Sequence, residues 1–208
     1  MKTIHSTDRP VDGRTTRWDE HRRQRKKELS RAALRAIRKK GAHVGMGEIA
    51  EEAGTSKTVY YRHFGDRAGL WSALTDRTVD FIIHRLSLDE TTNLAGDEIV
   101  AKLADAYLTL VERDPEIYEF VSAGPGPTSD TDITDPVVHV TSRIGIQLAA
   151  YLRRIGYDDR AEVFAQAIVG AIWAAADRWV ANDRRRSKAE VVAQLHELFQ
   201  PGLTLPPT

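Results

Sequence analysis

Residues 45–70 constrain the fold more than any other part of the chain, because they read as two short helices joined by a tight turn. Gly54 ends the first helix, where the backbone needs a residue that adopts a positive φ. Thr55 or Ser56 can cap the second helix, because a hydroxyl oxygen accepts a hydrogen bond from its free N–H groups. The segment therefore predicts a helix-turn-helix unit, an arrangement typical of DNA-binding proteins.

The second of these helices has one inward and one outward face. Tyr60 and Phe64 are four residues apart and share the inward face. The outward side chains are Lys57, Thr58, Tyr61 and His63. A lysine, a hydroxyl, a tyrosine and a histidine suit a groove lined with phosphates and base edges. Immediately afterwards Asp66 can cap a further helix, which places Arg67 in its first turn, close to the expected path of the DNA backbone.

The charge of the chain is divided unevenly along its 208 residues. The formal net charge is zero, but residues 1–40 hold fourteen Lys and Arg against five Asp and Glu, a balance of +9, so the remainder carries −9. This asymmetry indicates an anionic partner for the N-terminal segment. DNA is the leading candidate, and an anionic membrane surface is the competing one.

The N-terminal segment divides into an arm and a basic helix. Residues 1–16 are polar and predict a mobile basic arm, and a helix is expected from Arg17 to Lys40. Arg14 and Arg17 are expected to reach the DNA, where basic arms enter the minor groove. A solvated charged face is the alternative for this helix. Its apolar stripe is mostly alanine, which disfavours binding in a membrane interface.

The rest of the chain predicts helices and no strands. Helices are expected at about 46–53, 56–63, 66–86, 95–113, 115–122, 136–155, 159–183 and 188–199. The fold class is therefore all-α, with a helix-turn-helix domain at residues 17–65 and a second helical domain at residues 66–208.

The last two helices carry apolar faces wider than one neighbouring helix can cover. Packing within the protomer is the alternative for each single residue, but for the pair of helices we expect a dimer interface. A twofold dimer would place two reading helices about 34 Å apart on a pseudo-palindromic site. The expected interface residues are Phe164, Ile168, Ile172, Trp173, Val180, Val191, Leu195, Leu198 and Phe199.

Residues 17–75 resemble the DNA-binding domain of the TetR family of bacterial transcriptional regulators. The resemblance is carried by Ile49, Ala50, Ala53, Gly54, Thr55, Ser56, Lys57, Tyr61, Arg62, His63, Phe64, Arg67 and Leu70. It implies phosphate contacts from Tyr61, His63 and Arg67, and base contacts from Lys57 and Thr58. Most members have a threonine that caps the helix before the turn, whereas this chain has Gly45 there. Only backbone N–H groups would then bind phosphate at that position.

The resemblance also implies an effector cavity within the second domain. The residue types there indicate a small, largely apolar effector, and the basic first helix resembles that of members responding to fatty acyl derivatives. Plain core packing is the alternative for each of these side chains, and for the two histidines among them a hydrogen-bonded position in the core. The expected lining is Phe81, His84, Leu103, Tyr107, Tyr118, Phe120, His139, Ile144, Leu148, Phe164, Ile168 and Trp173.

Catalytic chemistry finds no support in the sequence. There is no cysteine, and the seven histidines are scattered without a metal-binding spacing. We therefore expect no catalytic residue, metal or cofactor. The N-terminus lacks the apolar core of a signal peptide, and no apolar run approaches the ~20 residues that span a bilayer. A cytoplasmic protein without a membrane partner is expected.

These patterns lead to one main hypothesis and two rivals. The main hypothesis is a homodimeric, ligand-responsive transcriptional regulator, a repressor that binds a double-stranded DNA operator and is released by its effector. The first rival is an all-α small-molecule carrier or enzyme with a vestigial helix-turn-helix. The second is a membrane-surface protein that uses the helix at residues 17–40.

Overall fold

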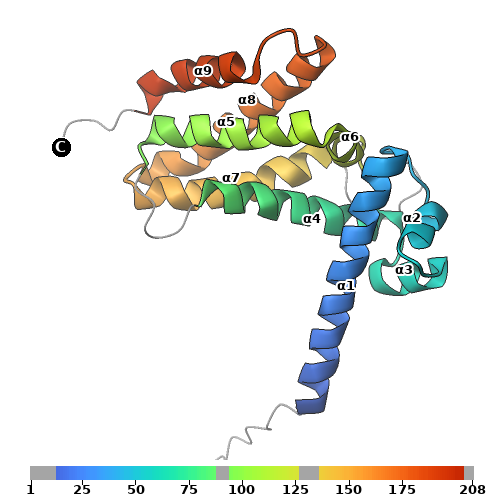
Figure 1. Ribbon diagram of the computed structural model, residues 1–208. Helices are drawn as coiled ribbons and strands as arrows, with labels where there is room; N and C mark the ends of the chain where they lie inside the picture. Colours follow the sequence, from blue (N-terminus) through green and yellow to red (C-terminus); the bar gives the residue numbers. More distant parts are fainter. Residues whose placement is uncertain (1–12, 88–93, 127–135, 204–208) are drawn as a thin grey trace, which may run out of the picture.

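The computed structural model describes residues 13–87, 94–126 and 136–203 (Figure 1). All regular structure within these ranges is helical, as predicted. The α-helices are α1 (Gly13–Lys40), α2 (Met46–Glu52), α3 (Lys57–Phe64), α4 (Arg67–Leu86), α5 (Gly96–Arg113), α6 (Pro115–Ala123), α7 (Pro136–Arg154), α8 (Ala161–Ala181) and α9 (Lys188–Phe199). Two short 3₁₀ turns, η1 (Asp158–Arg160) and η2 (Gln200–Gly202), precede α8 and follow α9.

Helices α1, α2 and α3 form an N-terminal unit that we call the head. Its small core joins the apolar stripe of α1 to the inward faces of the two short helices, through buried Leu29, Ile37, Ile49, Tyr60 and Phe64. Figure 1 shows that the first turns of α1 extend well beyond α2 and α3. Most of the N-terminal half of α1 is therefore not needed for the core of the head, and is available for another partner.

The first helix begins earlier than the sequence predicted. It starts at Gly13, so residues 13–16, assigned to the mobile arm, are helical. Arg14 and Arg17 consequently lie on the first turns of α1 rather than on an extended arm. Residues 1–12 lie outside the described part of the chain.

Tyr60 fastens α3 to α1. Its side chain is fully buried, and its hydroxyl donates a hydrogen bond to the Leu29 carbonyl oxygen at 2.8 Å. Burial raises the pKa of Tyr60 to about 12, so the phenol stays a neutral donor. Its ring also stacks on Phe64, with 5.6 Å between centroids. One side chain thus supplies both apolar contact and a directed bond across the head.

The turns have the chemistry that the sequence predicted, with one difference. Gly54 has φ +61°, and the Asp66 carboxylate accepts a hydrogen bond from the Gly69 N–H at 2.7 Å, which caps α4. Ser56 is the N-cap of α3, but its hydroxyl makes no capping hydrogen bond. Gly69 has a packing role as well, because a Cβ there would lie 1.8 Å from the Phe64 carbonyl oxygen. The bare backbone of Gly69 therefore lets α4 begin directly against the end of α3.

The start of α4 joins the head to the rest of the protein. Arg67 donates to the Val44 carbonyl oxygen at 2.8 Å and to the Ala42 carbonyl oxygen at 3.5 Å, both in the loop before α2. Its guanidinium also lies 5.6 Å from the ring centroid of Phe120 on α6. One turn later, Trp71 donates from Nε1 to the Phe120 carbonyl oxygen at 3.2 Å. These contacts fix the angle at which α4 leaves the head.

Helices α4 to α9 form the second unit, which we call the body. Figure 1 shows α4, α5, α7 and α8 stacked side by side, with α9 lying along α5 and α8 packed on α7. The core contains aliphatic and aromatic side chains from all six helices. Lys188 at the start of α9 binds Asp105 of α5 at 2.6 Å, which adds a polar contact to this pair of helices. Among the described residues, no helix is long and apolar enough to cross a membrane.

The two neighbouring tyrosines of α3 provide a matched test of the head. Tyr60→Phe removes the bond to Leu29 and leaves a buried carbonyl oxygen without that donor, so we expect the free energy of unfolding to fall by about 1 kcal/mol. Tyr61→Phe removes an exposed hydroxyl and should change stability by less than about 0.5 kcal/mol. Urea unfolding followed by circular dichroism measures both. Equal losses in the two variants would contradict the assigned role of Tyr60.

Candidate nucleic-acid interface and effector site

The outward face of α3 presents polar side chains without apolar cover. Lys57 and Thr58 are exposed, Tyr61 is 47% exposed, and His63 is partly exposed. The Lys57 side chain passes over α2, where a Cβ on Gly47 would lie 2.5 Å from its Cε. A larger residue at position 47 would displace this lysine. The structure therefore brings four of the predicted DNA-binding residues to one short helical surface.

A basic hollow adjoins this surface, between α3 and the N-terminal half of α1. It has a volume of 720 Å³, and Trp18 at its edge is 74% exposed. Among the side chains that the structure describes, its lining is cationic and aromatic without a carboxylate: Trp18, His21, Arg22, Arg25, Lys26, Arg62 and His63. Such a lining favours an anionic polymer over a small apolar ligand.

His63 connects the hollow to the surface of α3. Desolvation lowers its pKa below the ordinary value, and the nearby cations of Arg62, Arg25 and Arg22 lower it further. The imidazole is therefore held neutral at neutral pH in the free protein. An anion placed beside it would favour the protonated form, because it would offset the surrounding positive charge.

Two positions at this interface already make hydrogen bonds within the free protein, and their phosphate contacts stay predictions. The Arg67 guanidinium is hydrogen-bonded to two backbone carbonyls, so a phosphate contact would compete with those bonds. The Gly45 N–H donates to the Glu48 carboxylate at 3.1 Å, so that N–H is also engaged. Arg14 and Arg17 lie in the first turns of α1, and their DNA contacts stay a prediction.

Two cationic residues of the hollow, Lys26 and Arg62, were not among the predicted contacts. Arg22, Arg25 and Lys26 have the spacing of neighbours on one helical face, so the sequence held a signal for them. Arg62 follows Tyr61 and is exposed at the other side of the hollow. Its proximity to α1 depends on the packing of α1 against α3, which spacing within one helix does not reveal.

The predicted effector residues do not form one open cavity. Leu103, Tyr107, Ile144 and Trp173 meet around an enclosed apolar space between α5, α7 and α8, but its volume is only 10 Å³. A cavity of that size barely holds one water molecule. Burial raises the pKa of Tyr107, so its hydroxyl is neutral. In this conformation these side chains pack as a closed core.

The other predicted lining residues lie elsewhere. Phe81 and His84 are exposed on α4, and His139 lies beside Trp71. Phe164 and Ile168 line a groove at the end of α8. The remaining three, Tyr118, Phe120 and Leu148, are buried in α6 and α7.

The predicted dimer interface divides into two sets. Ile168, Ile172, Val191 and Leu195 are buried within their own protomer, although Ile168 also lines a groove at the surface, and their part in a dimer interface stays a prediction. Leu198 is 68% exposed, and Phe164, Trp173, Val180 and Phe199 are partly exposed. Val163, which was not predicted, is also exposed. Val163, Phe164, Leu198 and Phe199 border an apolar groove of 260 Å³ between α8 and the end of α9.

The described part of the chain contains no group of three or more His, Asp or Glu side chains arranged to hold a metal ion. Some polar side chains of the body form pairs, such as His196 with Asp97 at 3.1 Å, and Arg143 pairs with both Asp76 and Asp80. A histidine that pairs with a single carboxylate has an ordinary structural explanation.

Two family models match the chain and together cover most of it. Residues 29–74 match the model of bacterial regulatory proteins of the tetR family. Residues 84–205 match the model of the tetracyclin repressor-like C-terminal domain. The first match spans most of the head and the start of α4, and the second spans nearly all of the body.

Individual proteins support the same assignment. An HTH-type transcriptional regulator of Mycobacterium tuberculosis is 32% identical over 187 residues, which cover 89% of this chain and 80% of the relative. The HTH-type transcriptional activator FasR of Mycolicibacterium smegmatis is 26% identical over 191 residues, covering 88% and 84%. The structure of the regulator FadR of Bacillus subtilis in complex with stearoyl-CoA has the same fold, with a TM-score of 0.62, 18% identity, and 85% of this chain and 98% of that chain covered. This chain is a DNA-binding transcriptional regulator and belongs to the TetR family.

Proposed function

We propose that the protein binds a pseudo-palindromic operator as a homodimer and represses transcription until a largely apolar small molecule releases it. The observation that carries the DNA-binding part is the continuity of two surfaces. The polar face of α3 adjoins the basic hollow on α1, and His63 belongs to both. A groove-reading helix with an adjacent phosphate-binding surface is what a helix-turn-helix protein requires.

Each surface has its own part in this proposal. Lys57 and Thr58, at the start of α3, read base edges in the major groove. Tyr61, His63 and the cations of the hollow hold phosphates, with Arg14 and Arg17 extending the contact along α1. Phosphate contacts supply affinity that depends on salt, whereas base contacts decide sequence preference. Arg67 is a further candidate for a phosphate contact, and its bonds to the loop before α2 hold α4 against the head.

The outward apolar set on α8 and α9 supports a dimer. Val163 and Leu198 are large, exposed and adjacent to a groove, and a monomer gains nothing from leaving them in water. A twofold axis through this face would give each protomer the same surface, as isologous dimers have. It would also present two heads to the two halves of a pseudo-palindrome.

An effector in the body would have to open the closed core between α5, α7 and α8. Leu103, Tyr107, Ile144 and Trp173 would separate to admit it, and the displaced helices would move α4 and with it the head. An effector achieves this only by binding the open state more tightly than the closed one. The FadR structure of the same fold contains stearoyl-CoA. That complex supports a long acyl compound as the class of effector.

Selection of bound fragments from random duplex DNA tests the proposal directly. The purified protein at about 0.15 M salt should enrich a pseudo-palindrome, and adding a long-chain fatty acyl compound should abolish the enrichment. Lys57→Ala should change the enriched sequence, whereas Tyr61→Phe should weaken binding to all duplexes by a similar factor.

Two results would contradict the proposed function. A folded, dimeric protein that enriches no sequence in the absence of an acyl compound would favour a carrier with a vestigial helix-turn-helix. A Tyr61→Phe variant with altered preference but unchanged affinity would overturn the assigned roles. An unchanged selection in the presence of the acyl compound would remove only the effector part of the proposal.

The pH dependence of DNA binding tests the role of His63. Its pKa is lowered in the free protein, and a phosphate beside it would favour the charged form, so binding takes up a proton. Affinity should therefore rise as the pH falls from about 8 to about 6. Fluorescence anisotropy of a labelled operator measures the trend. The dependence of affinity on pH should become weaker in His63→Gln. An equally steep dependence in that variant would show that another group takes up the proton on binding.

The dimer face is tested by a charge at its exposed edge. Leu198→Glu should leave the protomer folded, because the side chain is already largely in water, but should weaken dimerisation about tenfold or more. Sedimentation velocity measures the association. Ile146→Glu, at an equally exposed apolar residue on α7, is the matched control and should leave the dimer intact. If the control dissociates and Leu198→Glu does not, the interface lies on another face.

A further inference from the structure

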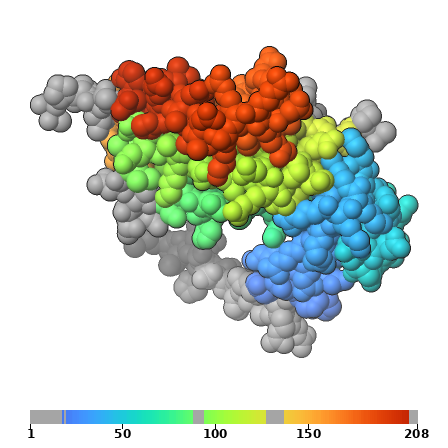
Figure 2. Space-filling model, turned by 45° about the horizontal axis from the view of Figure 1, so that its top comes forward, coloured from blue at the N-terminus to red at the C-terminus, as the bar shows by residue number. Residues whose placement is uncertain are grey.

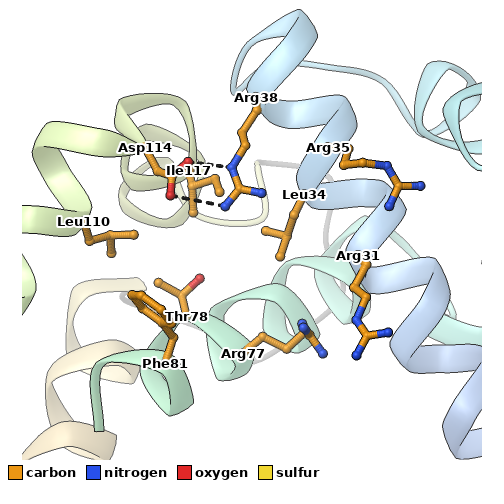
Figure 3. Close-up of a pocket in the computed structure, with 10 residues that line it drawn as sticks. All are labelled: Arg31, Leu34, Arg35, Arg38, Arg77, Thr78, Phe81, Leu110, Asp114 and Ile117. Atoms are coloured by element: carbon orange, nitrogen blue, oxygen red, sulfur yellow. Dashed lines mark hydrogen bonds and ion pairs between the residues drawn. The ribbon is translucent and has the colours of Figure 1, made fainter. Parts of the chain in front are cut away.

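A second cavity lies at the joint between head and body, apart from both the basic hollow and the closed core. It has a volume of 390 Å³ and is enclosed by α1, α4, the end of α5 and the start of α6 (Figure 3). Figure 2 shows the surface hollowed where the blue of α1 meets the green of the body. The volume falls within the ~300–1,000 Å³ range of small-molecule sites.

The charge of this cavity is strongly positive. Arg31, Arg35 and Arg38 of α1 and Arg77 of α4 line it, and Asp114 is the one carboxylate among its described lining residues. Asp114 is already paired with Arg38, through contacts of 2.5 and 3.2 Å (Figure 3). The other three arginines make no ion pair with any residue in the described part of the chain. Three uncompensated guanidinium groups therefore border one space.

Arg77 is the member of this group that most needs a partner. Its Nε atom is buried and has no hydrogen-bond partner among the described residues. In Figure 3 its guanidinium reaches from α4 toward Arg31 on α1. A buried donor of a charged group without a partner is costly, and like charges facing each other add to that cost. An anion bound between α1 and α4 would reduce both energetic costs, the unpartnered donor and the repulsion between like charges.

The remaining wall of the cavity is apolar. Leu34 of α1, Phe81 of α4, Leu110 of α5 and Ile117 of α6 contribute to it. Phe81 is 49% exposed, which is unusual for a large aromatic side chain. This wall would cover an apolar group of a ligand. Inorganic anions have no such group.

We propose that this cavity binds a phosphate monoester with an apolar substituent, at a site distinct from the effector space in the body. A phosphate monoester carries about −1.5 to −2 charges and three acceptor oxygens, which matches three guanidinium groups better than a single carboxylate does. The planar, forked guanidinium of arginine suits phosphate in particular. The ligand touches α1 and α4 at once, so its binding holds the head against the body.

The test is isothermal titration of the full-length protein, without DNA, with hexyl phosphate, adenosine monophosphate and inorganic phosphate. At least one organic phosphate should bind about tenfold or more tightly than inorganic phosphate, because only it uses the apolar wall. Tighter binding of hexyl phosphate would indicate a lipid-like source, and tighter binding of adenosine monophosphate a nucleotide. Equal binding of all three would overturn the proposal.

Variants separate this site from general attraction of anions. Arg31→Gln with Arg35→Gln changes two exposed residues, so it should fold normally and weaken binding of the organic phosphate about tenfold or more. Arg77→Gln should weaken it as well. Arg113→Gln removes one exposed charge from the last turn of α5 without touching the cavity, and should leave the affinity unchanged. Thermal melting verifies that each variant is folded.

Two outcomes with the variants would overturn the proposal. One is unchanged binding in the Arg31 and Arg35 double variant. The other is a loss in Arg113→Gln as large as the loss in that double variant, which would indicate a response to net charge alone.

Discussion

The arrangement of the whole protein depends on the contacts made by the first turn of α4. Asp66 caps the helix, Gly69 lets it start against α3, and Arg67 ties it to the loop before α2. One turn later Trp71 is hydrogen-bonded to the backbone of α6. These contacts are short-range and directional, so a small rotation of α4 in the body would be passed to α3 rather than absorbed in a flexible linker. The head and the body are therefore mechanically connected through α4, and the ion pair between Arg38 and Asp114 adds a second connection from α1.

Positive charge is concentrated where that connection is made. The basic hollow lies on the side of α1 next to α3, and the arginine-lined cavity lies on the side that faces the body. One helix therefore takes part in both surfaces, with Arg22 and Arg25 on the first and Arg31 and Arg35 on the second. Helix α1 contributes to the core of the head through its second half, where Leu29 and Ile37 are buried.

Much of this fold could be predicted because its signals are local. Helical spacing, glycines at turns and the cap at Asp66 located the helices to within a few residues, and alternation along α3 separated Tyr60 from Tyr61. The features that could not be predicted depend on contacts between distant segments. Ile172 and Leu195 are as apolar as Leu198, and only the packing of α8 and α9 on the body shows which ones the protomer itself covers. The engaged state of Arg67 and the cavity at the joint likewise depend on the angle between α1 and α4, which no local pattern encodes.

The closed core between α5, α7 and α8 has a consequence for how such a regulator would respond to concentration. If the body is occupied only in an open state that the free protein rarely adopts, the apparent Kd equals the intrinsic Kd divided by the open fraction. A tight intrinsic site would then respond only at high effector levels, and each core substitution that eases opening would lower that threshold without touching the ligand. The effector concentration at which the protein responds would then depend on how tightly Tyr107 and Trp173 pack, rather than on the contacts that the effector makes.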